Sequence, residues 1–143
     1  KWIDSQKWDF WCTFTTGYTL TLKSARRLME RYHDINRRCD IVTQMFWVAE
    51  PFELKDGYHT HALMSVKSEL PKDIELEMLK HNFQYASGRK VIANISGKLE
   101  YDKWHHIFLA KYNKRKGSAG GYCSKYVMKE QSNSSHAEYD III

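Results

Sequence analysis

His59 and His61 are separated by one residue in the segment Tyr58–Val66, whose composition favours a β-strand. Side chains at positions i and i+2 of a strand project from the same face, with their backbones about 6–7 Å apart. Two imidazoles arranged in this way can share one divalent metal ion, although a surface strand can also carry such a pair by chance. The spacing therefore makes His59 and His61 candidate metal ligands.

A carboxylate would complete this incomplete pair of ligands. Glu50 ends the preceding predicted strand, Ile41–Glu50, and can face the histidines across a hairpin. Glu53 lies in the charged turn Pro51–Gly57 and is the second choice. A mixed nitrogen and oxygen set tolerates Mg²⁺ or Mn²⁺, so the sequence predicts one such ion.

Tyr122, Lys125 and Tyr126 share one face of a short predicted helix, because they are three and four residues apart. A phenol has a pKa of about 10 and is a poor nucleophile at neutral pH. A metal ion that polarises the electrophile, or a nearby ammonium group, makes it usable. Ordinary packing is the alternative explanation, above all for Tyr126 beside Val127. The three residues are nevertheless candidates for catalysis.

A basic, glycine-rich loop directly precedes these tyrosines. Its cations and their aromatic neighbour could follow a phosphate backbone and stack on a base. The strand Trp8–Thr16 adds alternating threonines on one face, which could support the site or contact DNA. A solvated loop and simple β-propensity are the alternatives. The candidate DNA-contacting residues are Lys111, Lys114, Arg115, Lys116, Thr13 and Thr15.

His105 and His106 form a second histidine pair. Neighbouring residues of a strand point to opposite faces, so this pair does not predict a shared metal ion.

The elements that must position these groups alternate between strands and helices. Apolar residues recur every three to four positions in the segments predicted as helices. The segments predicted as strands are rich in β-branched and other apolar residues. The predicted helices are Thr21–Arg38, Asp73–Tyr85 and Tyr122–Glu130, and the further strands are Val91–Ile95, Ile107–Tyr112 and Ala137–Ile143. This order predicts an α+β fold with a central antiparallel sheet.

Length and composition set limits on the function. The 143 residues make one domain, and 43% hydrophobic with 27% charged residues is typical of a globular chain. The net charge of +5 favours anionic partners, nucleic acid first. No apolar run approaches the ~18 residues of a membrane span. Three scattered cysteines indicate a reducing compartment. The chain begins with Lys1 rather than Met, which is compatible with a piece of a longer protein.

Three sequence motifs occur in an order that resembles a known protein family. FWCTFTT, then YHTHAL, then YCSKYVMK together resemble the three motifs of the HUH endonuclease superfamily, in its class of rolling-circle replication initiators from phages, plasmids and small single-stranded DNA viruses. The motifs span residues 10–129. His59 and His61 match the metal-binding histidines, and Tyr122 and Lys125 match the Tyr-x-x-Lys motif.

The resemblance implies a five-stranded antiparallel sheet flanked by helices and a nicking reaction on single-stranded DNA at a replication origin or hairpin. Tyr122 would attack a phosphodiester, leaving a 5′-phosphotyrosine link and a free 3′-OH. His59, His61 and a carboxylate, most simply Glu50, would hold Mg²⁺ or Mn²⁺, and Lys125 would neutralise the phosphate. Tyr126 matches the second tyrosine that some phage initiators use, but single-tyrosine members can carry one there too. Thr60 stands where the family has a bulky apolar residue.

Other assignments remain open. A single-tyrosine transposase has the same motif order. Its tyrosine motif usually ends in Gln, and this chain has Lys125 at that position. A conjugative relaxase has its tyrosine before the histidines. A non-catalytic DNA-binding module would not need the histidines and Tyr122 together, and a metal-dependent hydrolase without a covalent intermediate would not need Tyr122. An initiator would work beside a host helicase and polymerase, in the cytoplasm of a prokaryote or in the nucleus for a eukaryotic virus.

Overall fold

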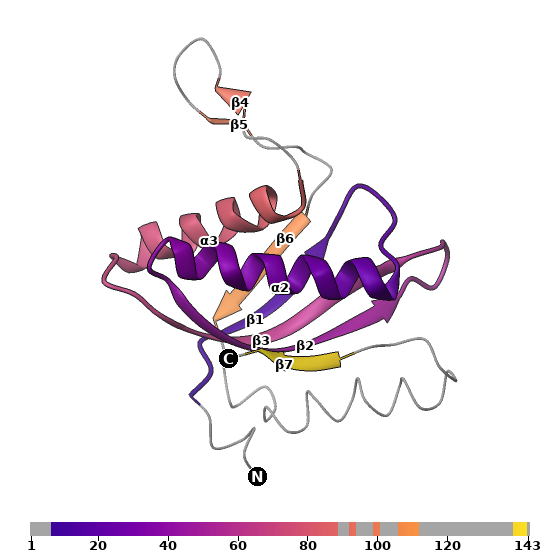
Figure 1. The fold of residues 1–143 in the computed structure, drawn as a ribbon, viewed down its shortest axis with the longest axis horizontal. Coiled ribbons are helices and arrows are strands. Elements are labelled where there is room, and N and C mark those ends of the chain that lie inside the picture. The colour runs from indigo at the N-terminus through magenta and orange to yellow at the C-terminus, as the bar shows by residue number, and fades with distance from the viewer. Residues whose placement is uncertain (1–6, 89–91, 94–98, 101–105, 112–138, 143) are drawn as a thin grey trace.

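The computed structural model describes residues 7–88, 92–93, 99–100, 106–111 and 139–142 (Figure 1). Its main feature is an antiparallel sheet with the strand order β6-β1-β3-β2-β7. The strands of this sheet are β1 (Phe10–Thr15), β2 (Val42–Pro51), β3 (Tyr58–Lys67), β6 (His106–Lys111) and β7 (Tyr139–Ile142). Two helices, α2 (Leu22–Arg38) and α3 (Lys72–Ala86), pack against it. The predicted α+β class, with an antiparallel sheet and flanking helices, is confirmed.

β2 and β3 form the predicted hairpin, and it is the longest pairing of the sheet. Its register runs from Val42 opposite Lys67 to Pro51 opposite Tyr58. The turn is closed by the Phe52 amide, which donates to the Gly57 carbonyl over 3.0 Å. Because the pairing is continuous up to this turn, the last residues of β2 lie directly opposite the first residues of β3.

β1 lies on the other side of β3 and brings a segment from far away in the sequence to the hairpin. The pairs run from Phe10 opposite Met64 to Phe14 opposite Thr60. β6 extends the sheet beyond β1, and β7 extends it beyond β2. β3 is therefore central, with β1 and β2 as its two neighbours.

α2 begins with a capping box that the sequence partly predicts. Thr21, the first residue of the predicted helix, is the N-cap: its hydroxyl accepts from the Ser24 amide, and the Ser24 hydroxyl accepts from the Thr21 amide. These bonds satisfy amides that have no partner inside the helix. The buried residues of α2 recur at helical spacing, and they are Ala25, Leu28, Met29, Tyr32, Ile35 and Asn36. This stripe faces the sheet.

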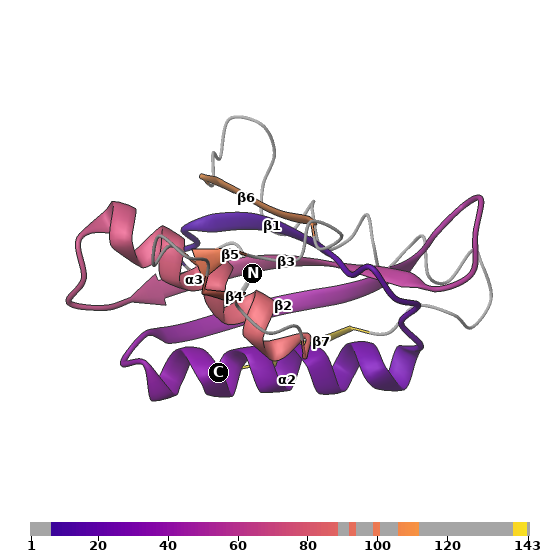
Figure 2. The ribbon, with the colours of Figure 1, turned by 90° about the horizontal axis from the view of Figure 1, so that it is seen from above.

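The core lies between the sheet and the two helices (Figure 2). Its centre is a cluster of three aromatic rings from three elements: Phe14 of β1, Tyr32 of α2 and Phe83 of α3. The Phe14 and Phe83 rings stack with centroids 4.5 Å apart, and Tyr32 meets both edge-on. The Tyr32 hydroxyl donates to the Leu79 carbonyl, so its polar end is satisfied inside the core.

The two faces of β3 have different surroundings because successive side chains point to opposite sides. Thr60, Ala62 and Met64 are buried toward the helices, and the Thr60 hydroxyl lies 3.5 Å from Met29 Sδ of α2. His59 and His61, which alternate with Thr60, therefore project from the face opposite the helices.

Two predicted elements differ in the structure or lie outside it. Within the predicted strand Val91–Ile95, the described residues form β4 (Ile92–Ala93), which pairs with β5 (Leu99–Glu100) in a separate two-stranded sheet. A strand was predicted here, and the described residues form one, but strand composition alone does not specify with which strand it pairs. The helix predicted over Tyr122–Glu130 lies outside the described residues. Among the described residues, no helix has the length and apolarity that a membrane span requires.

The turn of the β2–β3 hairpin depends on Gly57. This residue has φ +100°, and a Cβ atom built there would lie 2.9 Å from the Thr19 methyl carbon. We expect Gly57→Ala to lower the free energy of unfolding by about 1–3 kcal/mol, as measured by urea denaturation. Gly88→Ala is the matched control, because Gly88 has φ +85° but no atom within 4 Å of the same position. Equal losses in the two variants would contradict a steric contribution from Thr19.

Candidate metal centre

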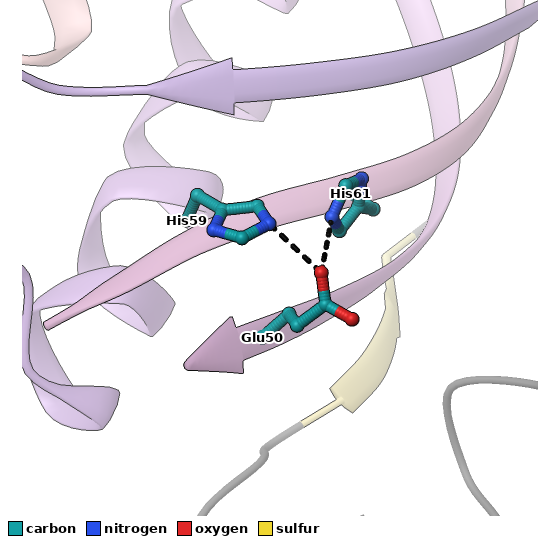
Figure 3. Close-up of side chains that lie close together, drawn as sticks. All are labelled: Glu50, His59 and His61. Atoms are coloured by element: carbon teal, nitrogen blue, oxygen red, sulfur yellow. Dashed lines mark hydrogen bonds and ion pairs between the residues drawn. The ribbon is translucent and has the colours of Figure 1, made fainter. Parts of the chain in front are cut away.

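The hairpin places Glu50, His59 and His61 on one face of the sheet (Figure 3). Glu50 and His59 are direct cross-strand partners, so their side chains leave the sheet side by side. His61 follows two residues later on β3 and therefore projects from the same face as His59. Strand alternation and hairpin register together are enough to bring the three side chains to one point.

One carboxylate oxygen of Glu50 contacts both imidazoles. Glu50 Oε1 lies 2.8 Å from His59 Nε2 and 3.0 Å from His61 Nε2. The two rings are 4.6 Å apart, with an angle of 78° between their planes. The three side chains are only 13–17% exposed, so the cluster is largely shielded from water while keeping some access.

This geometry fits a divalent metal ion. One potential ligand atom from each residue lies within 4.8 Å of the others, and the two Nε2 atoms converge on the same carboxylate oxygen. Two nitrogens and one carboxylate form a set that is compatible with Mn²⁺ or Mg²⁺ and leaves coordination positions free for water or substrate. The structure therefore contains a candidate metal centre made of Glu50, His59 and His61.

The two imidazoles differ in what surrounds them. His61 Nδ1 is hydrogen-bonded to Thr13 Oγ1 of β1 over 3.2 Å. His59 Nδ1 is buried and has no hydrogen-bond partner in the described part of the chain. The His59 ring instead lies against the Phe52 ring, with centroids 4.7 Å apart. Lys55 covers Phe52, with its ammonium group 4.3 Å from the ring centroid.

Three other predicted site residues are described by the structure, and they lie outside the metal cluster. Glu53 is exposed in the turn and is not part of the metal cluster. Thr15 is half-buried in β1, two residues from Thr13. Lys111 is exposed at the end of β6, opposite Phe10, and lines a pocket of about 410 Å³ with Asp9 and Lys72. Phe10 in turn pairs with Met64, three residues beyond His61, so Lys111 does not belong to the metal cluster.

The remaining predicted residues lie outside the described part of the chain. These are the catalytic candidates Tyr122, Lys125 and Tyr126, the basic-loop residues Lys114, Arg115 and Lys116, and His105. His106 is the first residue of β6 and is paired with Thr15.

Two reactive side chains of the described region are enclosed in the core. Burial raises the pKa of the Cys12 thiol far above its usual range. Burial, and then the charge of Cys12, raise the pKa of the Tyr32 phenol in the same way. Both groups stay protonated at neutral pH, so neither is a suitable nucleophile.

Phe52, which contacts His59, and Lys55, which contacts Phe52, were not predicted from the sequence. Both lie in the turn of the hairpin, where no periodic pattern indicates which way a side chain points. An aromatic residue and a lysine close to a predicted ligand pair were the available signal, but their contact depends on the turn closed by Gly57.

Comparison with known proteins finds no matching protein family, no matching curated protein and no matching solved structure.

Proposed function

We propose that this chain is a metal-dependent endonuclease domain for single-stranded DNA, of the kind that starts rolling-circle replication. The observation that carries the proposal is the cluster of Glu50, His59 and His61 on neighbouring strands of an antiparallel sheet. It occurs together with a Tyr-x-x-Lys motif at Tyr122 and Lys125. In this proposal the sheet is the five-stranded sheet of the HUH superfamily.

The reaction assigned to Tyr122 is a transesterification. Its phenol oxygen forms a bond to phosphorus, and the bond from phosphorus to the 3′-oxygen of the preceding nucleotide breaks. The phenol loses its proton, and the leaving oxygen takes one up to become a free 3′-OH. A divalent ion held by Glu50, His59 and His61 would polarise the scissile phosphate. The free 3′-OH can prime synthesis by a host polymerase and can later reverse the step to join strands.

Charged residues are assigned to the substrate. Lys125 neutralises the phosphate that Tyr122 attacks, because an ammonium group stabilises the negative charge of the transition state. The exposed Lys111, with Lys114, Arg115 and Lys116 of the following loop, is assigned to the DNA backbone. Thr15 is assigned to the same strand of DNA. The role of Tyr126 as a second nucleophile is tested by the substitution Tyr126→Phe.

The test is covalent capture of DNA. The protein is mixed with a labelled pool of single-stranded oligonucleotides that includes hairpins, in Mn²⁺ or in EDTA, and run on a denaturing gel. We expect a slowly migrating adduct in Mn²⁺ and none in EDTA. Calorimetric titration with Mn²⁺ shows whether the metal centre is loaded. Absence of an adduct from Mn²⁺-loaded protein that still binds the pool would overturn the nicking reaction and favour a DNA-binding module.

A further inference from the structure

His61 is held at both ring nitrogens, whereas His59 is held at one. The Nε2 atom of His61 lies 3.0 Å from Glu50 Oε1, and its Nδ1 atom lies 3.2 Å from Thr13 Oγ1. This second contact comes from a third strand, because Thr13 is the direct partner of His61 in the β1–β3 register. His59 Nδ1 has no such partner among the described residues.

We propose that Thr13 is a positioning residue that orients the His61 imidazole, so that Nε2 points to the place where Glu50 and His59 converge. Thr13 acts through His61 and touches neither metal nor DNA in this role. The inference rests on the metal centre of the proposed function, and it gives Thr13 a role that differs from the DNA contact predicted from the sequence.

A hydroxyl group is well suited to this position because it can both donate and accept a hydrogen bond. When His61 Nε2 carries the proton and donates to Glu50, Nδ1 has a lone pair and accepts from Thr13. When Nε2 gives its lone pair to a cation, Nδ1 carries the proton and donates to Thr13 instead. The same two atoms, 3.2 Å apart, therefore stay hydrogen-bonded in both tautomers.

Burial makes this bond important. The His61 side chain is only 13% exposed, so water cannot freely replace a missing partner of Nδ1. An unsatisfied buried donor costs free energy, and the cost falls on the tautomer that binds a cation. Loss of the Thr13 hydroxyl should therefore weaken cation binding rather than only loosen the fold.

The test compares Mn²⁺ binding by Thr13→Val and Thr13→Ser with that of the unaltered chain. Electron paramagnetic resonance of free Mn²⁺ gives the Kd without DNA. We expect Thr13→Val, which keeps the shape but removes the hydroxyl, to weaken binding about 10–100-fold, the usual cost of losing a partner of a metal-bound histidine. Thr13→Ser restores the hydroxyl and should return the Kd to within about threefold of the original.

Thr60→Val is the matched control. Thr60 lies between the two histidines but is fully buried toward α2, so the same substitution perturbs the strand without touching either imidazole. We expect its Mn²⁺ affinity to stay unchanged. An unchanged Kd in Thr13→Val, or an equal loss in Thr60→Val, would overturn the proposal, and urea unfolding shows how much of any effect is loss of the fold.

Nitrogen-15 spectra of the His61 imidazole separate this inference from the proposed function. We expect the Nδ1 chemical shift of the metal-free ring to change in Thr13→Val, because Nδ1 loses its hydrogen-bond partner, and to stay unchanged in Thr60→Val. If the wild type binds Mn²⁺ but forms no DNA adduct, the proposed nicking reaction is wrong. The effect of Thr13→Val on the Mn²⁺ Kd still tests the positioning role in that case. If the wild type binds no Mn²⁺, the metal centre fails, and identical spectra for both proteins would also reject the positioning role.

Discussion

Replacing Tyr122 with Phe is expected to abolish the covalent adduct with DNA completely while leaving single-stranded DNA binding within about threefold of the original. The substitution removes only the phenol oxygen, which is the atom that the proposed reaction joins to phosphorus. The aromatic ring and the neighbouring cations remain, so the contacts to the DNA backbone are preserved. The measurement is the Mn²⁺-dependent adduct on a denaturing gel, with a filter-binding Kd in parallel.

Tyr126→Phe is the matched control, because it makes the same change four residues away. We expect this variant to form the adduct at the original rate. An adduct that persists in Tyr122→Phe and disappears in Tyr126→Phe would move the nucleophile to Tyr126. An adduct that persists in each single variant and is lost only when both tyrosines are replaced would indicate two tyrosines that can each attack.

Three tyrosines in the described part of the chain, Tyr18, Tyr32 and Tyr85, are poor substitutes for the nucleophile. Tyr32 is fully enclosed, and its pKa is raised by burial. The Tyr18 hydroxyl donates to the Ser87 carbonyl over 2.8 Å. Tyr85 is 62% exposed and belongs to α3, which packs on the face of the sheet opposite the histidines. We therefore do not expect any of these three tyrosines to restore the adduct in Tyr122→Phe.

The second large effect is expected from Glu50→Gln. Glutamine keeps the size of the side chain but removes the negative charge that both histidine nitrogens share. Loss of an outer partner of a metal ligand typically weakens binding 10–100-fold. Loss of the only carboxylate in the described cluster should weaken Mn²⁺ binding by more than about 100-fold. The measurement is the Mn²⁺ Kd, with adduct formation as a second readout.

Glu53→Gln separates the two carboxylates that the sequence left as alternatives. Glu53 lies three residues from Glu50 but is exposed in the turn. It carries the same charge, so this variant controls for the general loss of one negative charge near the site. We expect its Kd to remain within about twofold of the original. Equal losses in the two variants would show that the ion lies nearer the turn than the cluster of Glu50, His59 and His61.

The hairpin that carries the metal ligands could be predicted from sequence because its information is local. Alternation of side chains puts His59 and His61 on one face of β3 whatever the rest of the fold does. The charged turn between Pro51 and Gly57 is short, and Glu50 just before it was correctly expected to face the histidines. α2 was predicted for the same reason. Its apolar stripe lies within seventeen consecutive residues, and its N-cap, Thr21, directly precedes them.

Contacts between distant segments needed the tertiary structure. The pairing of β1 with β3 places Thr13 opposite His61, 48 residues away, and no local pattern specifies that register. Exposure in the folded turn excluded Glu53 from the cluster, although its residue type and spacing were suitable. The segment around Ile92 had the composition of a strand but pairs with Leu99–Glu100 rather than with the central sheet.

Features that could be predicted from sequence depend on residues close together in the chain, whereas the others depend on contacts between distant segments. The sequence by itself determined which side chains share a face, because backbone geometry repeats every two residues in a strand and every 3.6 in a helix. The tertiary structure decided which strands are neighbours and in what register. That choice depends on packing between distant segments, such as that of Phe14 against Tyr32 and Phe83, and the resulting register places Thr13 opposite His61.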